Sequence, residues 1–358
     1  MKNLTIILLF TSLLACCSSD SETRMGNPNP EAMYFPPNGS ETWETKSATA
    51  LNWNEVKLQE LYNYLEDKNT KGFIILVNGR IAAEKYFDSH TATSPWYWAS
   101  AGKTLTATVT GIAQTDGHLN ISNKVSDYLG TGWTSAPLAK ENLITIRHLL
   151  TMTSGLDDTT GDDVSPSNLL YKADAGNRWG YHNVFVKLQD VVASATGKSW
   201  NEYFTSSLKN KIGMTGMWNT NSPNLSVYWS NTRSMARFGL LMLNEGKWNG
   251  QQVVDPAYWS EMTSASQEIN KSYGYLWWIN GEESYHLPQS QLQFNGSLVS
   301  SAPEDMYMAL GKNDQKIYVV PSRKMVIIRM GEAADGENFA LSDFDATVWE
   351  KISAVIGN

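Results

Sequence analysis

The sequence of 358 residues predicts a mixed α/β (α+β) fold, with an antiparallel sheet, flanking helices and a largely helical lobe. Towards both ends of the chain, apolar runs are short and rich in β-branched and aromatic residues. Between about 105 and 270, apolar residues mostly recur with the helical period. A sheet built from both ends, with the helical lobe inserted between them, is therefore the economical assembly. No stretch rich in Pro, Gly and Ser interrupts the chain after about Leu51, so we expect one globular unit over residues 46–358.

The globular unit is predicted to open with a helix and a β-hairpin. Apolar residues recur with the helical period over 54–67, and Asn54 is available as the N-cap. Two strand-like runs follow at 72–77 and 81–87, on either side of Asn78-Gly79. This dipeptide favours a two-residue hairpin turn, because Asn and Gly both tolerate a positive φ.

The later elements follow the same two periods. Helices are predicted over 143–152, 184–196, 201–211 and 235–245, and Gly197 and Gly246 act as stop signals. Strands are predicted over 273–279, 306–311, 315–320 and 325–330, with a turn at 321–324 and a closing helix over 341–356.

The first residues of the chain have the pattern of an export signal. Lys2 is followed by an apolar run that ends near Ala15, well short of the roughly 20 apolar residues that span a membrane. The end of this run, Leu13 to Cys16, resembles the lipobox of bacterial lipoproteins, which implies lipidation of Cys16. An ordinary secretory signal peptide, with Cys16 incidental, is the alternative. We expect a signal peptide over 1–15, a polar tether over 16–45, and a lipoprotein anchored in the membrane of the bacterial cell envelope, in the periplasm or at the outer membrane.

Charge, cysteine and histidine content exclude several classes of function. The formal net charge is −8 and no run of Lys and Arg occurs, so we expect no nucleic-acid partner. Both cysteines, Cys16 and Cys17, lie at the signal junction, so disulfides, Cys-bound zinc and thiol nucleophiles are excluded from the globular unit. The five His are widely separated, and we expect no metal and no cofactor. Nothing in the sequence defines an oligomeric state.

Ser100 and Lys103 form the first candidate site. If Ser100 begins a helix, Lys103 lies one turn further along the same face, and its amine can reach the serine hydroxyl. A serine hydroxyl is a poor nucleophile until a base takes its proton, and a lysine can be that base where burial and nearby donors lower its pKa. Alone, Ser-x-x-Lys is more often a solvated helix face. A phosphate-binding loop is excluded, because it needs Gly where Tyr97 stands.

The segment Tyr181-His182-Asn183 lies just before the helix predicted to begin at 184. Taken alone, it favours structural roles, with Asn183 as a helix cap and Tyr181 as a packed aromatic residue.

Four segments together resemble the serine β-lactamase/penicillin-binding-protein superfamily in order and spacing. They are Trp98–Thr104, Ile144–Leu156, Tyr181–Asn183 and Ala236–Gly246. More narrowly, the sequence is similar to class C β-lactamase-like serine hydrolases, which include esterases, D-alanyl-D-alanine peptidases and 6-aminohexanoate oligomer hydrolases. The resemblance runs from about Met33 to the C-terminus. It implies a β-lactamase/transpeptidase-like fold, with the active site between the sheet and the helical lobe.

The resemblance also implies roles for individual residues. Ser100 would be the acylated nucleophile and Lys103 its proton acceptor. Tyr181 would protonate the leaving group, and Asn183 would orient Lys103 and the substrate carbonyl. This set is chemically coherent, because acyl transfer needs a nucleophile, a base, an acid and oxyanion donors around one carbonyl.

The third motif of the family best matches Gly311 to Gln315. Lys312 takes the lysine position, and the backbone N–H of Gln315 would form the oxyanion hole together with that of Ser100. Asp314 stands where the family has Gly. If its carboxylate faces the cleft, it repels the carboxylate that β-lactams and D-Ala-D-Ala ends carry, which favours an uncharged ester or amide as substrate.

Trp98 adds an open question about the walls of the site. It either lines an aromatic pocket or belongs to the core, and the sequence favours neither.

The sequence thus predicts a serine hydrolase that forms an acyl-enzyme on Ser100. Its substrate would be an uncharged ester or amide, a peptidoglycan stem peptide, or a β-lactam. The alternative is a noncatalytic envelope protein of the same fold that binds peptidoglycan fragments or glycans. The altered residues around Asp314 favour that alternative, whereas the complete set of Ser100, Lys103, Tyr181 and Asn183 favours the enzyme.

Overall fold

The computed structural model describes residues 31–222, 225–335 and 341–357. The chain from Met33 onwards forms one compact unit, close to where the family resemblance begins. The predicted signal peptide, with Cys16 and Cys17, lies outside the described residues. Within the ranges given above, no helix has both the length and the apolar composition needed to cross a membrane.

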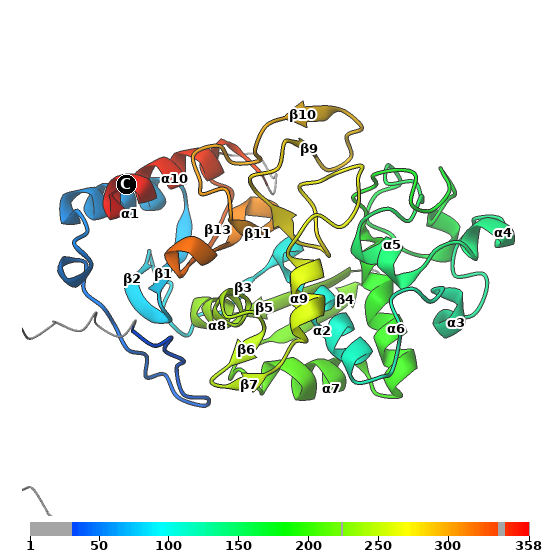
Figure 1. Cartoon of the computed structure of the whole chain (residues 1–358), viewed down its shortest axis with the longest axis horizontal. Coiled ribbons are helices and arrows are strands. Elements are labelled where there is room, and N and C mark those ends of the chain that lie inside the picture. Colours follow the sequence, from blue (N-terminus) through cyan, green and yellow to red (C-terminus); the bar gives the residue numbers. More distant parts are fainter. Residues whose placement is uncertain (1–30, 223–224, 336–340, 358) are drawn as a thin grey trace, which may run out of the picture. The chain divides into compact units, whose positions relative to one another are not determined.

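A main sheet is built from both ends of the chain, as predicted (Figure 1). Every pairing between its strands is antiparallel. In spatial order, its strands are β2 (Arg80–Tyr86), β1 (Thr70–Val77), β13 (Met325–Gly331), β12 (Gln315–Val320), β11 (Tyr307–Gly311) and β8 (Trp278–Ile279).

The hairpin between β1 and β2 turns at the predicted dipeptide. Asn78 and Gly79 both have positive φ, 50° and 82°, which is the geometry that a two-residue turn requires. A Cβ atom on Gly79 would lie only 1.9 Å from the carbonyl oxygen of Tyr34, so this position accepts glycine alone. The helix before the hairpin, α1 (Glu55–Asp67), is capped by the side chain of Asn54, as predicted.

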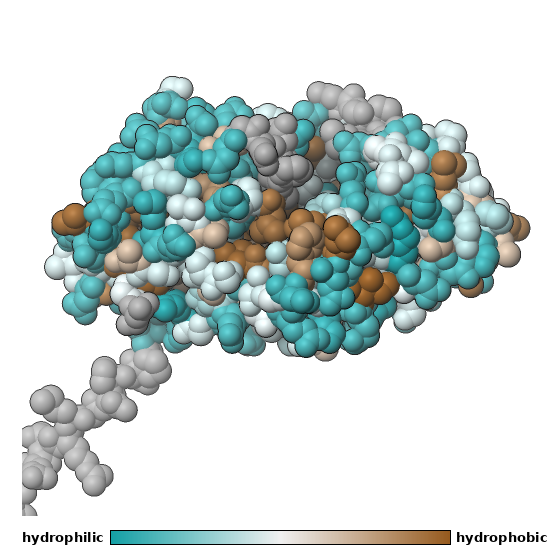
Figure 2. All heavy atoms as spheres, turned by 90° about the horizontal axis from the view of Figure 1, so that it is seen from above, coloured by the Kyte–Doolittle hydropathy of each residue, from teal (hydrophilic) through white to brown (hydrophobic). Residues whose placement is uncertain are grey.

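Helices cover both faces of the main sheet. On one face lies α8 (Thr232–Leu243), whose Gly239 backbone approaches Ile317 and Ile328, a cross-strand pair of β12 and β13. The neighbouring pair, Lys316 and Arg329, points to the opposite face, because successive side chains alternate along a strand. There α10 (Asp343–Ile356) packs beside α1. On the side seen in Figure 2, mostly hydrophilic residues cover the surface, and apolar residues gather towards its middle.

The helical lobe lies at the other end of the unit from α1 and α10 (Figure 1). Its helices are α2 (Lys103–Thr115), α3 (Ser126–Leu129), α4 (Leu138–Glu141), α5 (Ile146–Leu150), α6 (Lys187–Thr196), α7 (Trp200–Phe204) and α9 (Pro256–Met262). Short 3-10 segments supplement them, and α7 continues as a π-helix over Thr205–Lys209. In place of the helix predicted over 143–152, the structure has α5, which is only five residues long.

The middle of the chain also contains small sheets that the sequence does not predict. One consists of β3 (Trp96–Tyr97), β5 (Leu225–Ser230) and β4 (Met217–Ser222), and two hairpins pair β6 (Lys247–Trp248) with β7 (Gln251–Gln252) and β9 (Ser284–His286) with β10 (Gln293–Asn295). The strand predicted over 273–279 is reduced to β8, because Leu276 adopts a positive φ of 60° and breaks the extended run.

The last part of the predicted tether is packed on the folded unit, so the tether cannot extend to 45. Trp43 is buried, and its indole nitrogen donates to the carbonyl of Gly79. Arg237 of α8, also buried, donates to the carbonyls of Pro36 and Pro37. These contacts bind the chain from about residue 34 onwards to the main sheet and to α8.

Candidate active site

Ser100 and Lys103 meet as their spacing predicts. Ser100 lies in a 3-10 turn, Ala99–Gly102, that leads directly into α2, and Lys103 is the first residue of that helix. Nζ of Lys103 and Oγ of Ser100 are 2.7 Å apart and share a hydrogen bond. Ala99 has a positive φ of 48°, which costs an alanine roughly 1 kcal/mol, so the surrounding packing holds Ser100 on a strained turn.

Aromatic rings enclose the amine of Lys103. The side chain is buried, and Nζ lies 4.5 Å from the ring centre of Phe185 and 4.9 Å from that of Tyr181. Among the described residues, no carboxylate forms an ion pair with Lys103. Its one hydrogen-bond partner in the described chain is the Ser100 hydroxyl, so the two groups are placed to exchange a proton directly.

Tyr181 joins the site through its ring. The ring stacks on Trp278, with centroids 5.8 Å apart, and contacts Tyr273 edge to face. Lys103 lies over the ring, and the Tyr181 hydroxyl forms no hydrogen bond with Lys103 or Ser100. The role of the hydroxyl as a leaving-group acid therefore remains a prediction.

Asn183 lies in the wall of the pocket and does not cap a helix. It begins a 3-10 turn, Asn183–Val186, whose N-cap position is His182, and α6 starts only at Lys187. Its side-chain amide donates to the carbonyl of Asp162 at 3.0 Å.

One pocket of about 440 Å³ brings these residues together. Five residues predicted from the sequence line it: Ser100, Lys103, Tyr181, Asn183 and Lys312. The sequence reasoning missed other lining residues, among them Tyr97, Asp158, Asp162, His182 and Phe185. Two features of the sequence could have indicated these residues. His182 stands between Tyr181 and Asn183, and an acid-rich run follows Leu156.

Asp314 does not face this pocket, which corrects the expectation of a negative charge beside the substrate. Its carboxylate points to the other side of the main sheet, where it accepts hydrogen bonds from the Ser342 hydroxyl at 2.8 Å and the backbone N–H of Ala334 at 3.0 Å. The amine of Lys316 is 3.1 Å away. The cause is the backbone: Asn313 and Asp314 both have positive φ, 60° and 58°, a conformation that Asn and Asp tolerate better than most residues.

The side chain of Gln315 does not enter the pocket either. It is fully buried and fixes the loop between β11 and β12, donating to the carbonyls of Asn313 and Gly331 and accepting from the N–H of Gly331. Only its backbone N–H was assigned to the oxyanion hole, so that role remains a prediction. Arg329 also holds the loop, through the carbonyls of Asn313 and Asp314.

A close backbone contact brings this loop to the serine. A Cβ atom on Gly311 would lie 2.5 Å from the carbonyl oxygen of Trp98 and 3.0 Å from the N–H nitrogen of Ala101. Only glycine allows the end of β11 to pack so tightly against the turn that holds Ser100. Position 311 thus sets how near Lys312 lies to the nucleophile.

Trp98 belongs to the core, which settles the question the sequence left open. Its side chain is completely buried, and its indole nitrogen donates to the Ser230 hydroxyl at 2.7 Å. Tyr97, the preceding residue, lines the pocket instead and accepts a hydrogen bond from the side-chain amide of Asn313 at 2.6 Å.

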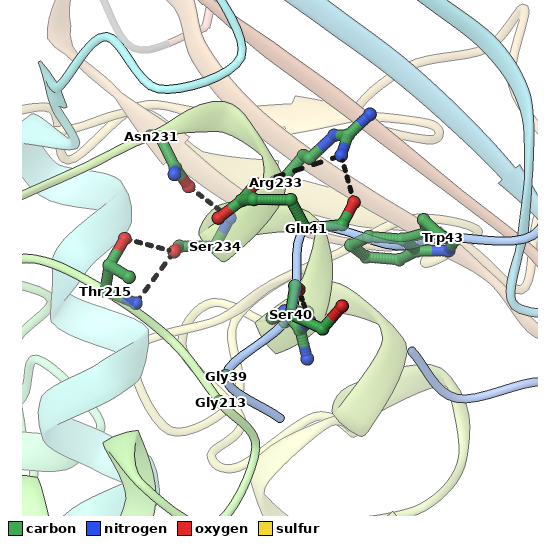
Figure 3. A pocket seen from close by; sticks show the side chains of 10 residues that line it. Gly39, Ser40, Glu41, Trp43, Gly213, Thr215, Asn231, Arg233 and Ser234 are labelled. Carbon is green, nitrogen blue, oxygen red and sulfur yellow. Dashed lines mark hydrogen bonds and ion pairs between the residues drawn. The ribbon is translucent and has the colours of Figure 1, made fainter. Parts of the chain in front are cut away.

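A second, much smaller pocket of about 50 Å³ lies near α8, and its polar groups already satisfy one another (Figure 3). The Ser234 hydroxyl accepts a hydrogen bond from the backbone N–H of Thr215 and shares another with the Thr215 hydroxyl. The backbone N–H of Ser234 donates to the side chain of Asn231, and Arg233 donates to the carbonyl of Glu41. We therefore assign no reaction to this smaller pocket. Across the described ranges, no cluster of His, Cys, Asp and Glu is placed to hold a metal ion.

Several solved structures have the same fold. A protein of Bacillus anthracis, provisionally named a 6-aminohexanoate-dimer hydrolase, matches 82% of this chain and 81% of its own, with a TM-score of 0.65 and 19% identity. A Bacteroides dorei protein, provisionally named a beta-lactamase, matches 86% of this chain and 100% of its own, with a TM-score of 0.66 and 16% identity. A family VIII carboxylesterase matches 83% of this chain and 95% of its own, with a TM-score of 0.61 and 14% identity.

The fold is thus the one that these solved structures share, and Ser100 and Lys103 are paired in its pocket. The model of the beta-lactamase family matches residues 65–346, most of the chain. The chain belongs to the beta-lactamase family.

Proposed function

We propose that the protein hydrolyses an ester or amide through an acyl-enzyme on Ser100. The 2.7 Å hydrogen bond between Lys103 Nζ and Ser100 Oγ carries this proposal. In the acylation step, Oγ bonds to the substrate carbonyl carbon, and the hydroxyl proton passes to the amine of Lys103. The bond from that carbon to the leaving group then breaks. Water attacks the Ser100 ester in a second step, which releases the acid and restores the hydroxyl.

The other residues of the pocket supply the remaining functions in this proposal. The leaving group departs with a proton, for which Lys103 and the Tyr181 hydroxyl are the nearest candidates. The backbone N–H groups of Ser100 and Gln315 are proposed to stabilise the oxyanion. The close packing of Gly311 on the Ser100 turn supports this assignment, because it brings the two backbone segments together.

The pocket is compatible with an uncharged ester or amide and, equally, with a stem peptide or a β-lactam. The carboxylate of Asp314 points away from the pocket, so it does not repel a carboxylate on the substrate. Lys312, which lines it, is the candidate partner for a substrate carboxylate. The names of the structural neighbours, a carboxylesterase among them, support ester or amide chemistry in general.

A fluorophosphonate serine probe gives the decisive experiment. We expect intact-protein mass to show a single adduct on the unmodified protein and none on Ser100→Ala, while circular dichroism shows that both are folded. An adduct that persists in Ser100→Ala would reject the mechanism. Absence of any adduct on the folded, unmodified protein would favour noncatalytic binding of peptidoglycan fragments or glycans.

We also propose, from the sequence, that the protein is exported and anchored by lipid on Cys16. Expression in a bacterial host with a radiolabelled fatty acid tests this. Label is expected on the unmodified protein and not on Cys16→Ser, and label absent from both would leave an ordinary secretory signal peptide.

A further inference from the structure

His182 is a buried histidine in the pocket wall that has no hydrogen-bond partner. Its side chain is one of those that line the pocket, yet the residue is only 3% exposed. Neither Nδ1 nor Nε2 meets the geometry of a hydrogen bond with any described residue, although the backbone of Gly161 lies close enough to act on the ring. A buried polar group without a hydrogen bond is unfavourable, and a correctly placed ligand group would remove that loss.

Carboxylates surround this imidazole. The charges of Asp157, Asp158 and Asp162 all act on His182, and Asp158 and Asp162 line the same pocket. Asp158 is buried and binds Arg178 through Oδ1 at 2.7 Å, while its Oδ2 is buried without a partner in the described chain. Arg178 does not line the pocket; its second amino nitrogen, also buried without a hydrogen-bond partner in the described chain, lies beside Gly180.

The charge at this end of the pocket is negative. Asp157 is paired with Lys172 and Asp158 with Arg178, whereas the exposed Asp162 has no ion-pair partner among the described residues. The amino groups of Lys103 and Lys312, and no carboxylate of this group, line the reacting end.

The groups at the acidic end are mainly hydrogen-bond acceptors. Burial lowers the pKa of His182, so its ring is neutral at physiological pH and has one N–H and one bare nitrogen. The carbonyl of Gly161 lies beside the ring and favours an N–H on that side. The acceptors that remain are the other ring nitrogen, Oδ2 of Asp158 and the carboxylate of Asp162. A primary ammonium group, with three donors and a positive charge, complements this set.

We propose that the end of the pocket formed by His182, Asp158 and Asp162 binds a primary ammonium group of the substrate. The substrate is then an ester or amide with a free amine at some distance from the reacting carbonyl. The inference rests on the proposed function for the Ser100 end of the pocket, and it makes His182 and Asp162 specificity-determining residues.

Three fluorophosphonates with tails of equal length test this proposal directly. The tails end in a methyl group, a hydroxyl group or a primary ammonium group, and the rate of Ser100 labelling is measured by mass spectrometry. We expect the ammonium probe to react about tenfold faster or more than the other two, as a charge-assisted hydrogen bond implies.

Variants separate local binding from general attraction to an acidic protein. His182→Phe and Asp162→Asn should each lower the ratio of the ammonium-probe rate to the methyl-probe rate. Glu60→Gln is the matched control, because it also removes one exposed negative charge, but on α1, where Glu60 pairs with Lys57. The preference should persist in this control. Asp162→Asn changes an exposed side chain and keeps the test valid if His182→Phe does not fold.

Each outcome decides a different point. Equal rates for all three probes, or an ammonium preference that survives in both variants, would overturn the subsite while leaving the nucleophile established. A hydroxyl probe as fast as the ammonium probe would overturn the assignment to an amine. If no probe labels the folded protein, the proposed function fails, and this inference fails with it.

Discussion

Two lysines of this protein are almost completely buried, and their surroundings differ in one decisive respect. Lys316, in the main sheet, lies 2.7 Å from Asp345 and 3.1 Å from Asp314, so two carboxylates compensate its charge. Lys103, in the pocket, has a hydroxyl and two aromatic rings as neighbours. A buried lysine is therefore no sign of an active site by itself. The partner of its amine decides whether a proton can move.

The largest effect is expected on catalysis from Lys103→Met. This variant removes the proton acceptor and keeps an apolar side chain between the rings, so the rate of Ser100 acylation should fall about 10³-fold or more. The melting temperature should change little, since no ion pair of the described chain is broken. Labelling kinetics with the fluorophosphonate probe and a thermal melt measure both quantities. Acylation at close to the original rate would show that another group takes the proton.

Lys316→Met should have the opposite profile. It leaves Asp314 and Asp345 buried without their counter-ion, which typically costs about 3–5 kcal/mol of unfolding free energy. Urea denaturation measures the loss. Adding Asp314→Asn and Asp345→Asn to the same chain removes the uncompensated charges and should restore part of the stability. A single variant as stable as the original would mean that the cluster is not a significant source of stability.

Asp314→Asn tests the corrected position of this side chain. Loss of the charged interactions with Lys316 and Ser342 should cost about 1–3 kcal/mol. The ratio of β-lactam to neutral-ester hydrolysis should stay unchanged, because the carboxylate lies outside the pocket. Rates on the two substrates, measured below the unfolding transition, check this, and a ratio that rises would return Asp314 to the substrate site.

The smallest effect concerns pH. Burial lowers the pKa of His182 below its value in the unfolded chain, so the folded state favours the neutral ring. Stability should therefore be lost as the pH falls below about 6.5, where the imidazole of the unfolded chain takes up a proton more readily than that of the folded protein. His182→Gln should flatten the fall of the melting temperature between neutral and mildly acidic pH. An identical slope in both proteins would show that other groups control acid stability, for which the half-buried His148, whose pKa is also lowered, is the next candidate.

Local signals in the sequence predict those parts of the structure that depend on few neighbours. Asn78-Gly79 specifies its turn, Asn54 caps its helix, and Ser100 meets Lys103 because a single helical turn separates them. The direction of Asp314 is not local. It depends on a backbone with positive φ and on Ser342, which is 28 residues further along the chain.

The acidic end of the pocket also could not be predicted from the periodicity of the sequence. His182 and Asp158 lie on irregular segments outside helices and strands, so no repeating pattern indicates that they share a wall. The strands β4 and β5 were missed for a related reason. They form a small sheet inside a region whose apolar residues mostly follow the helical period.

The cluster behind the pocket has a consequence for the order in which the protein is made. The loop that carries Lys312 is held through Asp314 and Lys316 by Ser342 and Asp345, which lie at the start of α10. A ribosome synthesises this part of the chain after every residue that lines the pocket. The pocket wall therefore gains this support only after residues 342–345 have been synthesised, and we expect Ser100 to react with the fluorophosphonate probe only from that point on.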